Sequence, residues 1–331
     1  MKEGKALDKT IKCDLGEEKK EISLNLRPTS FDDYIGQKEI TDNLKVFIEA
    51  CKKRNEPLDH ILLYGQAGLG KTSLAYVIAK EMGVNIKVIS APAIEKAGEI
   101  ASILNSLLPN DILFIDEIHR LPRAVEETLY SAMEDYAIDI IIGKGQQGKS
   151  IRLNLPKFTL IGATTRAGMI TAPLRDRFGI TFRFDYYKDD ELVRLINRSF
   201  DILRCKNTEE TARIIAGRSR GTPRIANKIV KRCCDFATVD NIETIDKAYV
   251  LTILDRLCIS EDGLDDMDNL IITTIRDKFN SGPVGLSTLA SAIGEDEDTL
   301  AFVYEPYLIY LGYIMRTPKG RILTEKIKGD V

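Results

Sequence analysis

A glycine-rich stretch from Gly65 to Thr72 constrains the fold of this chain more than any other part of its sequence. It reads GQAGLGKT, and it lies between an apolar run at 61–64 and a helical pattern that starts near Leu74. A strand, a glycine-rich loop and a helix in this order are typical of a phosphate-binding loop. Glycines let backbone N–H groups and the helix N-terminus face a phosphate. The sequence therefore predicts that the protein binds a nucleoside triphosphate.

The second half of this loop supplies the residues expected to hold the nucleotide. They are Gly68, Gly70, Lys71, Thr72 and Ser73. In such loops the lysine reaches the β- and γ-phosphates, and the threonine hydroxyl binds Mg²⁺. A glycine-rich turn before an ordinary helix is the alternative, and the correct segments on both sides argue against it.

Strand-like and helix-like segments alternate after the loop. The first helix stops at Gly83, and a second is predicted at 100–108. Strands are predicted at 84–89, 112–115, 158–163 and 180–184. The wholly apolar run at 112–115 is typical of a strand buried on both faces of a parallel sheet. This order predicts an α/β fold with helices on both faces of a parallel sheet.

Two acids, Asp116 and Glu117, directly follow one of these strands. In open parallel sheets, ligands bind beyond the carboxyl ends of the strands, where these acids must lie. Asp116 is suited to hold Mg²⁺, and Glu117 to orient or deprotonate an attacking water. A solvated pair of loop acids is the alternative. His119 has no partner that the sequence identifies, so a structural role is expected for it.

Between residues 137 and 155 the apolar residues recur every second position, which predicts a β-hairpin inserted into the domain. A two-stranded hairpin cannot bury both of its faces alone. Its apolar side chains are therefore expected either to dock on a partner protein or to pack on the parent domain. The residues concerned are Ile138, Ile140, Ile141 and Ile142.

The second half of the chain changes character near residue 188. Helical periodicity at 191–204, 208–216 and 223–236 predicts a small all-α domain. Thr222 and Pro223 have the residue types of a helix cap and first position, and Arg224 follows in the first turn. A cation there opposes the helix dipole, which hints at an anion to be met.

The C-terminal part has the pattern of a winged helix. An acidic stretch at 261–266 marks a boundary, and three helical patterns follow it. Strands are then predicted at 310–315 and 322–324, joined by a basic turn at 316–321. Its cations suit contact with DNA phosphates, and a solvated basic turn is the alternative. They are Arg316, Lys319 and Arg321.

Composition limits the class of protein. A length of 331 residues suggests two domains, or three small ones. The net charge is only -3, so a nucleic-acid partner must meet a local basic patch. Six cysteines without a C-x-x-C pair predict free thiols in a reducing compartment. We expect a cytoplasmic protein, because no long apolar segment is present to span a membrane and the N-terminus lacks a signal-peptide core.

Several longer motifs are distinctive: the segment 26–37, ILFIDEIHR at 112–120, AMEDY at 132–136, GATTRAG at 162–168, PLRDRFG at 173–179, RGTPRIAN at 220–227, and the segment 316–321. In these motifs, and from about Leu26 to Thr324, the chain resembles the RuvB family, whose members are Holliday-junction branch-migration ATPases of the AAA+ class. The resemblance implies an ATPase domain at 23–187, a helical lid at 188–258 and a winged helix at 259–331. Residues 1–22 match nothing diagnostic of the family, and their scattered charges and weak pattern predict a flexible arm. The family usually has two prolines where this chain has Gln66 and Ala67, which affects nucleotide affinity rather than chemistry.

The resemblance also implies roles for single residues. Residues expected at the nucleotide are Leu26, Arg27, Tyr34, Ile35, Glu134, Asp135, Tyr136 and Tyr187. Thr165 would be the polar sensor that positions water, and Arg177 the finger inserted into a neighbouring subunit's site. Arg224 would sense the γ-phosphate from the lid. The hairpin would dock a RuvA-like protein, and the basic turn would touch the DNA backbone.

The function implied is that of a homohexameric, ATP- and Mg²⁺-dependent translocase. It would migrate Holliday junctions in recombination and repair, with a RuvA-like partner and a RuvC-like resolvase. A clamp-loader-type ATP switch is the main alternative. Such subunits often carry Ser-Arg-Cys where this chain has 176–178, and they usually end in a helical collar. A third possibility is a winged-helix regulator that binds ATP without hydrolysing it. The presence of Lys71, Asp116 and Glu117 argues against it, because such a regulator needs no acid that activates water.

Overall fold

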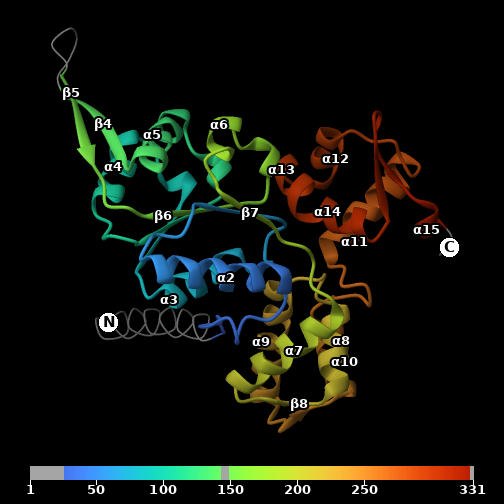
Figure 1. Cartoon of the computed structure of the whole chain (residues 1–331). Coiled ribbons are helices and arrows are strands. Elements are labelled where there is room, and N and C mark those ends of the chain that lie inside the picture. The colour runs from blue at the N-terminus through green and yellow to red at the C-terminus, as the bar shows by residue number, and fades with distance from the viewer. Residues whose placement is uncertain (1–25, 143–148, 329–331) are drawn as a thin grey trace, which may run out of the picture. The chain divides into compact units, whose positions relative to one another are not determined.

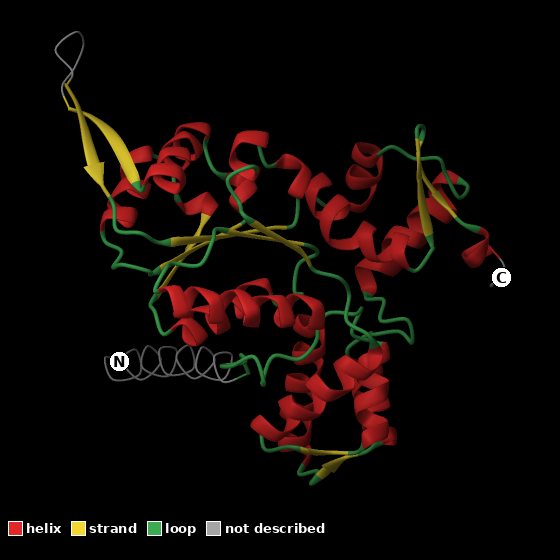
Figure 2. Cartoon of the chain, viewed as in Figure 1, coloured by secondary structure: helices red, strands yellow, loops and turns green. Residues whose placement is uncertain are grey.

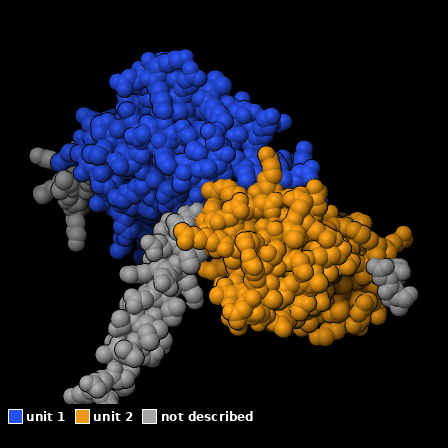
Figure 3. Space-filling model, turned by 90° about the horizontal axis from the view of Figure 1, so that it is seen from below, with its two compact units in different colours: residues 1–191 blue, residues 192–331 orange. Residues whose placement is uncertain are grey.

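The computed structural model describes residues 26–142 and 149–328 (Figure 1). The predicted arm at 1–22 and the turn of the hairpin at 143–148 lie outside these residues. The chain divides into two compact units, 1–191 and 192–331, which are coloured separately in Figure 3.

A five-stranded parallel sheet forms the centre of the first unit, in the strand order β2–β3–β6–β1–β7. Its strands are β1 (Ile61–Tyr64), β2 (Ile86–Ser90), β3 (Ile112–Asp116), β6 (Thr159–Thr164) and β7 (Ile180–Arg183). The apolar strands β1, β3 and β6 occupy the middle, where helices cover both faces (Figure 2). Because all five strands run in parallel, their carboxyl ends share one edge. The predicted α/β fold is confirmed.

The helices of this unit lie on either side of the sheet, with α2 and α3 on one face and α4 and α5 on the other (Figure 1). The helices are α2 (Lys38–Arg54), α3 (Lys71–Met82), α4 (Ala97–Asn105), α5 (Arg123–Asp135) and α6 (Ala172–Arg175). Single 3₁₀ turns connect them at η1 (Ala91–Ala93), η2 (Ile118–Arg120) and η4 (Ala167–Met169). Side chains of α4, α5 and the sheet form one buried core, which includes Leu104, Leu129 and Phe158.

The inserted hairpin is present as the antiparallel strands β4 (Ala137–Ile142) and β5 (Lys149–Asn154). Ile138 pairs with Leu153 in the ladder, and Ile140 pairs with Ile151. Ile138 is buried in the domain core, so the prediction that it contacts a partner is wrong for this residue. Farther along the hairpin the domain no longer covers the strands, and Ile151 is 50% exposed. The side chains of Ile140, Ile141 and Ile142 lie outside the described part.

The second unit begins with a helical lid. Its helices are α7 (Asp189–Ile202), whose first turn belongs to the first unit, α8 (Glu209–Gly217), α9 (Pro223–Asp240) and α10 (Lys247–Arg256). Thr222 occupies the cap position of α9 and Pro223 is its first residue, as predicted, but the Thr222 hydroxyl makes no cap hydrogen bond and donates instead to the Ser219 carbonyl oxygen. The lid also contains a two-residue parallel pair, β8 (Lys206–Asn207) and β9 (Thr244–Ile245), which is too short to show an apolar pattern in the sequence.

A winged helix completes the second unit. Three helical stretches precede the wing: α11 (Asp266–Thr273) with the π turn η5 (Thr274–Lys278), α12 (Leu286–Ile293), and α13 (Glu297–Thr299), η6 (Leu300–Tyr304) and α14 (Glu305–Tyr310) in succession. The wing strands β10 (Ile314–Thr317) and β11 (Gly320–Leu323) are antiparallel, and the short α15 (Glu325–Lys328) follows. The first wing strand starts later than predicted, because Tyr310 still belongs to α14. Among the described residues, no helix is long and apolar enough to cross a membrane.

Candidate nucleotide site, arginine finger and DNA-binding wing

The phosphate loop connects β1 to α3 at the carboxyl edge of the sheet. Helix α3 begins at Lys71, and its cap residue Gly70 has a φ of 97°. A side chain at Gly70 would place its Cβ 2.9 Å from the Tyr34 hydroxyl oxygen. Only glycine combines this backbone conformation with this close approach. The positively polarised N-terminus of α3 therefore opens directly onto the loop, as a phosphate site requires.

Lys71 is buried inside the loop. Its ammonium donates hydrogen bonds to the carbonyl oxygens of Gly65 at 2.7 Å and Gln66 at 2.8 Å. Burial lowers the pKa of Lys71 to about 8, although Asp116 and Glu117 raise it in part. A desolvated ammonium that holds only loop carbonyls gains by meeting a phosphate. The Thr72 hydroxyl and the Asp116 carboxylate add the hard oxygen donors that Mg²⁺ prefers, so these residues fit ATP and Mg²⁺.

Two tyrosines predicted to border the nucleotide lie against the loop. The Tyr34 hydroxyl donates to the Gly70 carbonyl oxygen at 3.3 Å, and the Tyr187 hydroxyl to that of Leu69 at 3.4 Å. Burial raises the pKa of both phenols, so they remain neutral donors at pH 7. Leu26 and Ile35 are half-buried. The Arg27 guanidinium lies 5.1 Å from the centre of the Tyr76 ring on α3.

The predicted acids end β3 at the same edge. The Asp116 carboxylate accepts from the backbone N–H of Glu117 at 3.0 Å. The Glu117 carboxylate accepts from the Thr165 hydroxyl at 3.4 Å and lies 3.3 Å from Nδ1 of His119. The structure thus brings Glu117 together with Thr165, the predicted sensor. Sequence reasoning missed the contact of His119, whose only signal was its position two residues after Glu117.

Arg177 lies at the opposite edge of the sheet. The backbone N–H of Ile180 donates to the His60 carbonyl oxygen, so β7 starts beside the start of β1, and Arg177 precedes it. Its guanidinium donates to the Pro173 carbonyl oxygen at 2.6 Å, pairs with Glu134 at 3.0 Å and lies 4.6 Å from the Tyr130 ring centre. A four-residue strand of about 13 Å separates this edge from the phosphate loop, which exceeds the reach of an arginine side chain.

The other predicted residues at the end of α5 share this edge. The Tyr136 ring packs against those of His60 and Phe158 (centroid distances 6.3 and 5.9 Å), before β1 and β6 begin. Asp135 pairs with Arg152 of β5 at 2.7 Å. Glu134, Asp135 and Tyr136 therefore do not border this chain's own loop. For the nucleotide of a neighbouring subunit their role stays a prediction.

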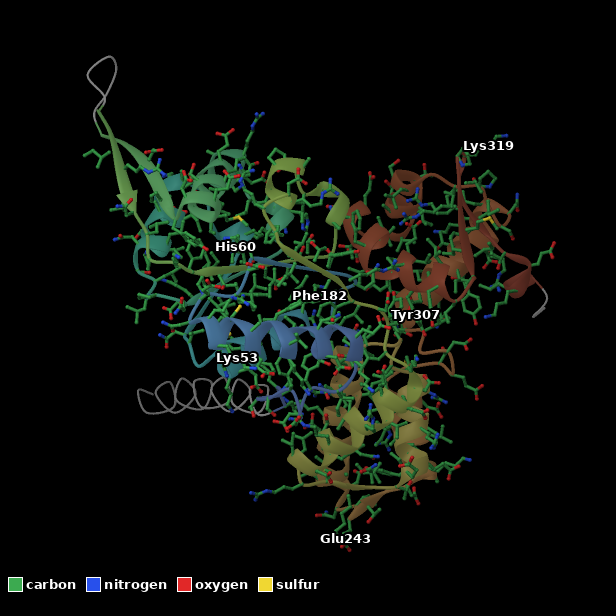
Figure 4. All side chains as sticks on the ribbon, viewed as in Figure 1. Lys53, His60, Phe182, Glu243, Tyr307 and Lys319 are labelled. Atoms are coloured by element: carbon green, nitrogen blue, oxygen red, sulfur yellow. The ribbon has the colours of Figure 1, made fainter. Side chains whose placement is uncertain are left out.

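The basic wing carries an internal ion-pair network. Arg316 and Arg321 face each other across the two wing strands, and both bind the buried carboxylate of Glu305. The Arg316 side chain remains 52% exposed, whereas that of Arg321 is only 17% exposed. Lys319 is exposed at the tip of the wing (Figure 4). Arg316 and Lys319 are thus better placed for DNA phosphates than Arg321, whose guanidinium is largely used by Glu305.

Arg224 is exposed in the first turn of α9, within the second unit. Its predicted role as a γ-phosphate sensor stays a prediction.

A phosphate loop, an Asp-Glu pair at the end of an inner strand, a helical lid and a winged helix together define a P-loop ATPase of the AAA+ class. Family models match every part of this arrangement: the Holliday junction DNA helicase RuvB P-loop domain at 26–184, the RuvB AAA lid domain at 187–260 and the RuvB C-terminal winged-helix domain at 261–328. The chain belongs to the RuvB family.

Solved structures agree with the family models. The Thermotoga maritima RuvB Holliday junction branch migration motor is 46% identical, with a TM-score of 0.84 over 93% of this chain and 99% of that one. A single-residue variant of that protein matches with 46% identity and a TM-score of 0.85 over 92% and 99% of the two chains. The resemblance found in the sequence is confirmed, and the clamp-loader alternative is not favoured.

Proposed function

We propose that this chain is a cytoplasmic, ATP-driven motor that migrates Holliday junctions as a homohexameric ring. A RuvA-like protein would hold the junction, and a RuvC-like resolvase would join the larger complex. The observation that supports a ring of subunits is the position of Arg177 at the sheet edge opposite to the phosphate loop. An arginine finger placed there serves only a nucleotide bound by another subunit.

Different residues of the described part would carry out different steps of ATP hydrolysis. Lys71 and the N-terminus of α3 bind the phosphates, and Thr72 and Asp116 hold Mg²⁺, which neutralises phosphate charge when bound. Glu117, next to the Thr165 hydroxyl, orients the attacking water and takes its proton. Arg177 of a neighbouring subunit stabilises the charge that develops on the γ-phosphate.

Two surfaces serve the partners. Arg316 and Lys319 of the wing contact the phosphates of duplex DNA, which gives binding with little sequence preference. The outer part of the hairpin, around Ile140, Ile141, Ile142 and the exposed Ile151, docks the RuvA-like protein. The sequence supports this interaction site, because consecutive isoleucines put apolar side chains on both faces of a hairpin that cannot bury both faces alone.

The proposal is tested with Arg177→Ala and Glu117→Gln, and with Arg175→Ala as a matched control, since Arg175 is an exposed arginine on the same short segment. Arg177→Ala is expected to bind ATP within about twofold of wild type and to hydrolyse it on the order of 10³-fold more slowly. Glu117→Gln is expected to assemble but stall, and Arg175→Ala to behave as wild type. ATP turnover and strand separation of four-way-junction DNA with a RuvA-like partner are the measurements.

Two results would contradict the proposal. Full ATPase activity of Arg177→Ala, or normal turnover by a strictly monomeric protein, would exclude a shared site. Normal ATPase activity without strand separation of the junction would point instead to an ATP switch of the clamp-loader type.

A further inference from the structure

His119 is buried beside the candidate catalytic acid and has no role in the mechanism above. It lies on the single 3₁₀ turn η2, which directly follows Glu117, and its side chain is 3% exposed. Its Nδ1 atom is 2.8 Å from the Thr164 hydroxyl oxygen and 3.3 Å from Oε2 of Glu117. One ring nitrogen therefore contacts both the last residue of β6 and the acid after β3.

The turn that carries His119 is fixed by its neighbours. Ile118 is fully buried, and a Cβ at Gly162 would lie 2.8 Å from its Cδ1 atom. The side chain of Ile118 on this turn therefore packs directly against the backbone of β6 at Gly162. Glu117 itself has a φ of 52°, a left-handed conformation that is uncommon outside glycine. The surroundings must hold such a residue in place, so the contacts of its side chain matter.

The hydrogen-bond partners assign the proton of the imidazole. The Thr164 hydroxyl, which also accepts from the backbone N–H of Arg166 at 2.9 Å, can donate or accept and so fits either tautomer of His119, whereas the carboxylate of Glu117 can only accept. An unprotonated Nδ1 would turn its lone pair toward the carboxylate, which is repulsive. We therefore assign the proton to Nδ1, which lies 2.8 Å from the Thr164 hydroxyl oxygen and 3.3 Å from Oε2 of Glu117. Burial lowers the pKa of His119, which keeps the ring neutral and Nε2 unprotonated.

We propose that His119 is a positioning residue for ATP hydrolysis, because its Nδ1–H and the Thr165 hydroxyl both lie next to Oε2 of Glu117, at 3.3 and 3.4 Å, and together restrict the orientation of this carboxylate. Oε1 is then the oxygen that faces the attacking water. This inference rests on the proposed role of Glu117 as the base. Orientation matters to the rate, because a displacement of about 1 Å costs up to about 10²-fold in turnover.

Three substitutions separate the N–H donor from the packing. His119→Phe keeps a ring but removes the donor, and His119→Gln moves its amide to about the position of Nε2, away from Glu117. His119→Asn keeps an N–H close to the position of Nδ1. His119→Phe and His119→Gln are expected to lower kcat by about 10- to 100-fold, with KM for ATP and Kd for ADP within about twofold. His119→Asn is expected to recover kcat to within about fivefold of wild type.

The double variant His119→Phe with Glu117→Gln tests whether the histidine acts through the acid. It should be no slower than Glu117→Gln alone, because residues that act as one unit are not additive. Any of three results overturns the inference: wild-type kcat in His119→Gln, an additional loss in the double variant, or His119→Asn as slow as His119→Gln. If Glu117→Gln itself turned over normally, the proposed function would fail first, and the two failures are thus distinguishable.

Discussion

At the scale of single residues, His60 shows that the contacts of a buried polar side chain could not be predicted from its position in the sequence. His60 lies just before β1 and is buried at the amino edge of the sheet (Figure 4). Its Nδ1 accepts from the backbone N–H of Leu160 at 2.9 Å, so its Nε2–H donates to the Met133 carbonyl oxygen at 3.2 Å. The ring thus joins β6 to the end of α5 as a neutral imidazole. In the sequence it was only one of two histidines without a pattern.

Burial lowers the pKa of His60 below its ordinary value of 6.5. The unfolded chain therefore binds a proton below pH 6.5 that the folded chain refuses, and stability falls as the pH decreases from about 6.5 toward the folded pKa. The slope contributed is at most about 1.4 kcal/mol per pH unit. His60→Asn is expected to reduce the slope of unfolding free energy between pH 7.5 and 5.5. Urea unfolding at several pH values measures this.

His119→Asn is the comparison for that experiment, because His60 and His119 are the two histidines of the chain and burial lowers the pKa of both, so this variant is also expected to reduce the slope. The His60→Asn, His119→Asn double variant shows the slope that remains without either imidazole. If His60→Asn retained the full wild-type slope, the folded state would have to accept a proton at residue 60.

At the scale of elements, the sequence predicted the features that depend on a few adjacent residues. The phosphate loop, the apolar strands β1, β3 and β6, and the start of α9 at Thr222 each follow from a few adjacent residues. Contacts between distant segments were not predictable in this way. The link between Glu305 and the wing joins residues 11 and 16 positions apart, and nothing in the basic turn distinguishes Arg316 from Arg321. Likewise, Ile138 is buried because residues from distant parts of the domain pack around the base of the hairpin, which the hairpin sequence does not indicate.

The wing leads to a prediction about its cations. Lys319→Ala is expected to weaken junction DNA binding several-fold and to lower the salt slope of log K by about one, because one phosphate contact is lost. Arg321→Ala should instead destabilise the winged helix by about 1–3 kcal/mol, since it removes one partner of the buried Glu305 carboxylate. Fluorescence anisotropy across salt concentrations and thermal unfolding measure the two effects.

One result would contradict these roles of Lys319 and Arg321. If Arg321→Ala lowered the salt slope as Lys319→Ala does and left the unfolding midpoint unchanged, the guanidinium of Arg321 would be a DNA contact rather than a support for Glu305. Arg316, half-exposed and bound to the same carboxylate, is expected to show both effects to a smaller degree.

At the scale of the whole molecule, the proposed ring has each catalytic site divided between two subunits, because the sheet separates the two groups of residues within one chain. The carboxyl edge carries Lys71, Asp116 and Glu117, and the amino edge carries Arg177. The family resemblance implied such a finger, and the register of β7 beside β1 puts Arg177 at the edge away from this chain's own phosphate loop. Sequence patterns alone did not place Arg177 at that edge, because this requires knowing which strands lie side by side.

This division predicts complementation between inactive variants. Arg177→Ala and Glu117→Gln are each expected to be nearly inactive alone. In a randomly mixed ring made from equal amounts, about one interface in four joins an intact Glu117 to an intact Arg177. The mixture should therefore recover about a quarter of wild-type ATP turnover, measured after the two proteins are denatured and refolded together or exchanged with DNA present. A mixture no more active than its components would mean that both residues act within one chain.

The opposite placement of loop and arginine also gives every subunit a front and a back. A twofold pair brings like edges together, so it completes no site, whereas head-to-tail contacts complete one site at every junction and form a ring when the rotation between subunits closes. In such a ring each site has one neighbour that lends an arginine and another that borrows one. The strand order of a single subunit therefore determines the order of the sites around such a ring. If the DNA entered the ring from the other side, the direction of travel along the DNA would reverse, and the order of the sites would stay the same.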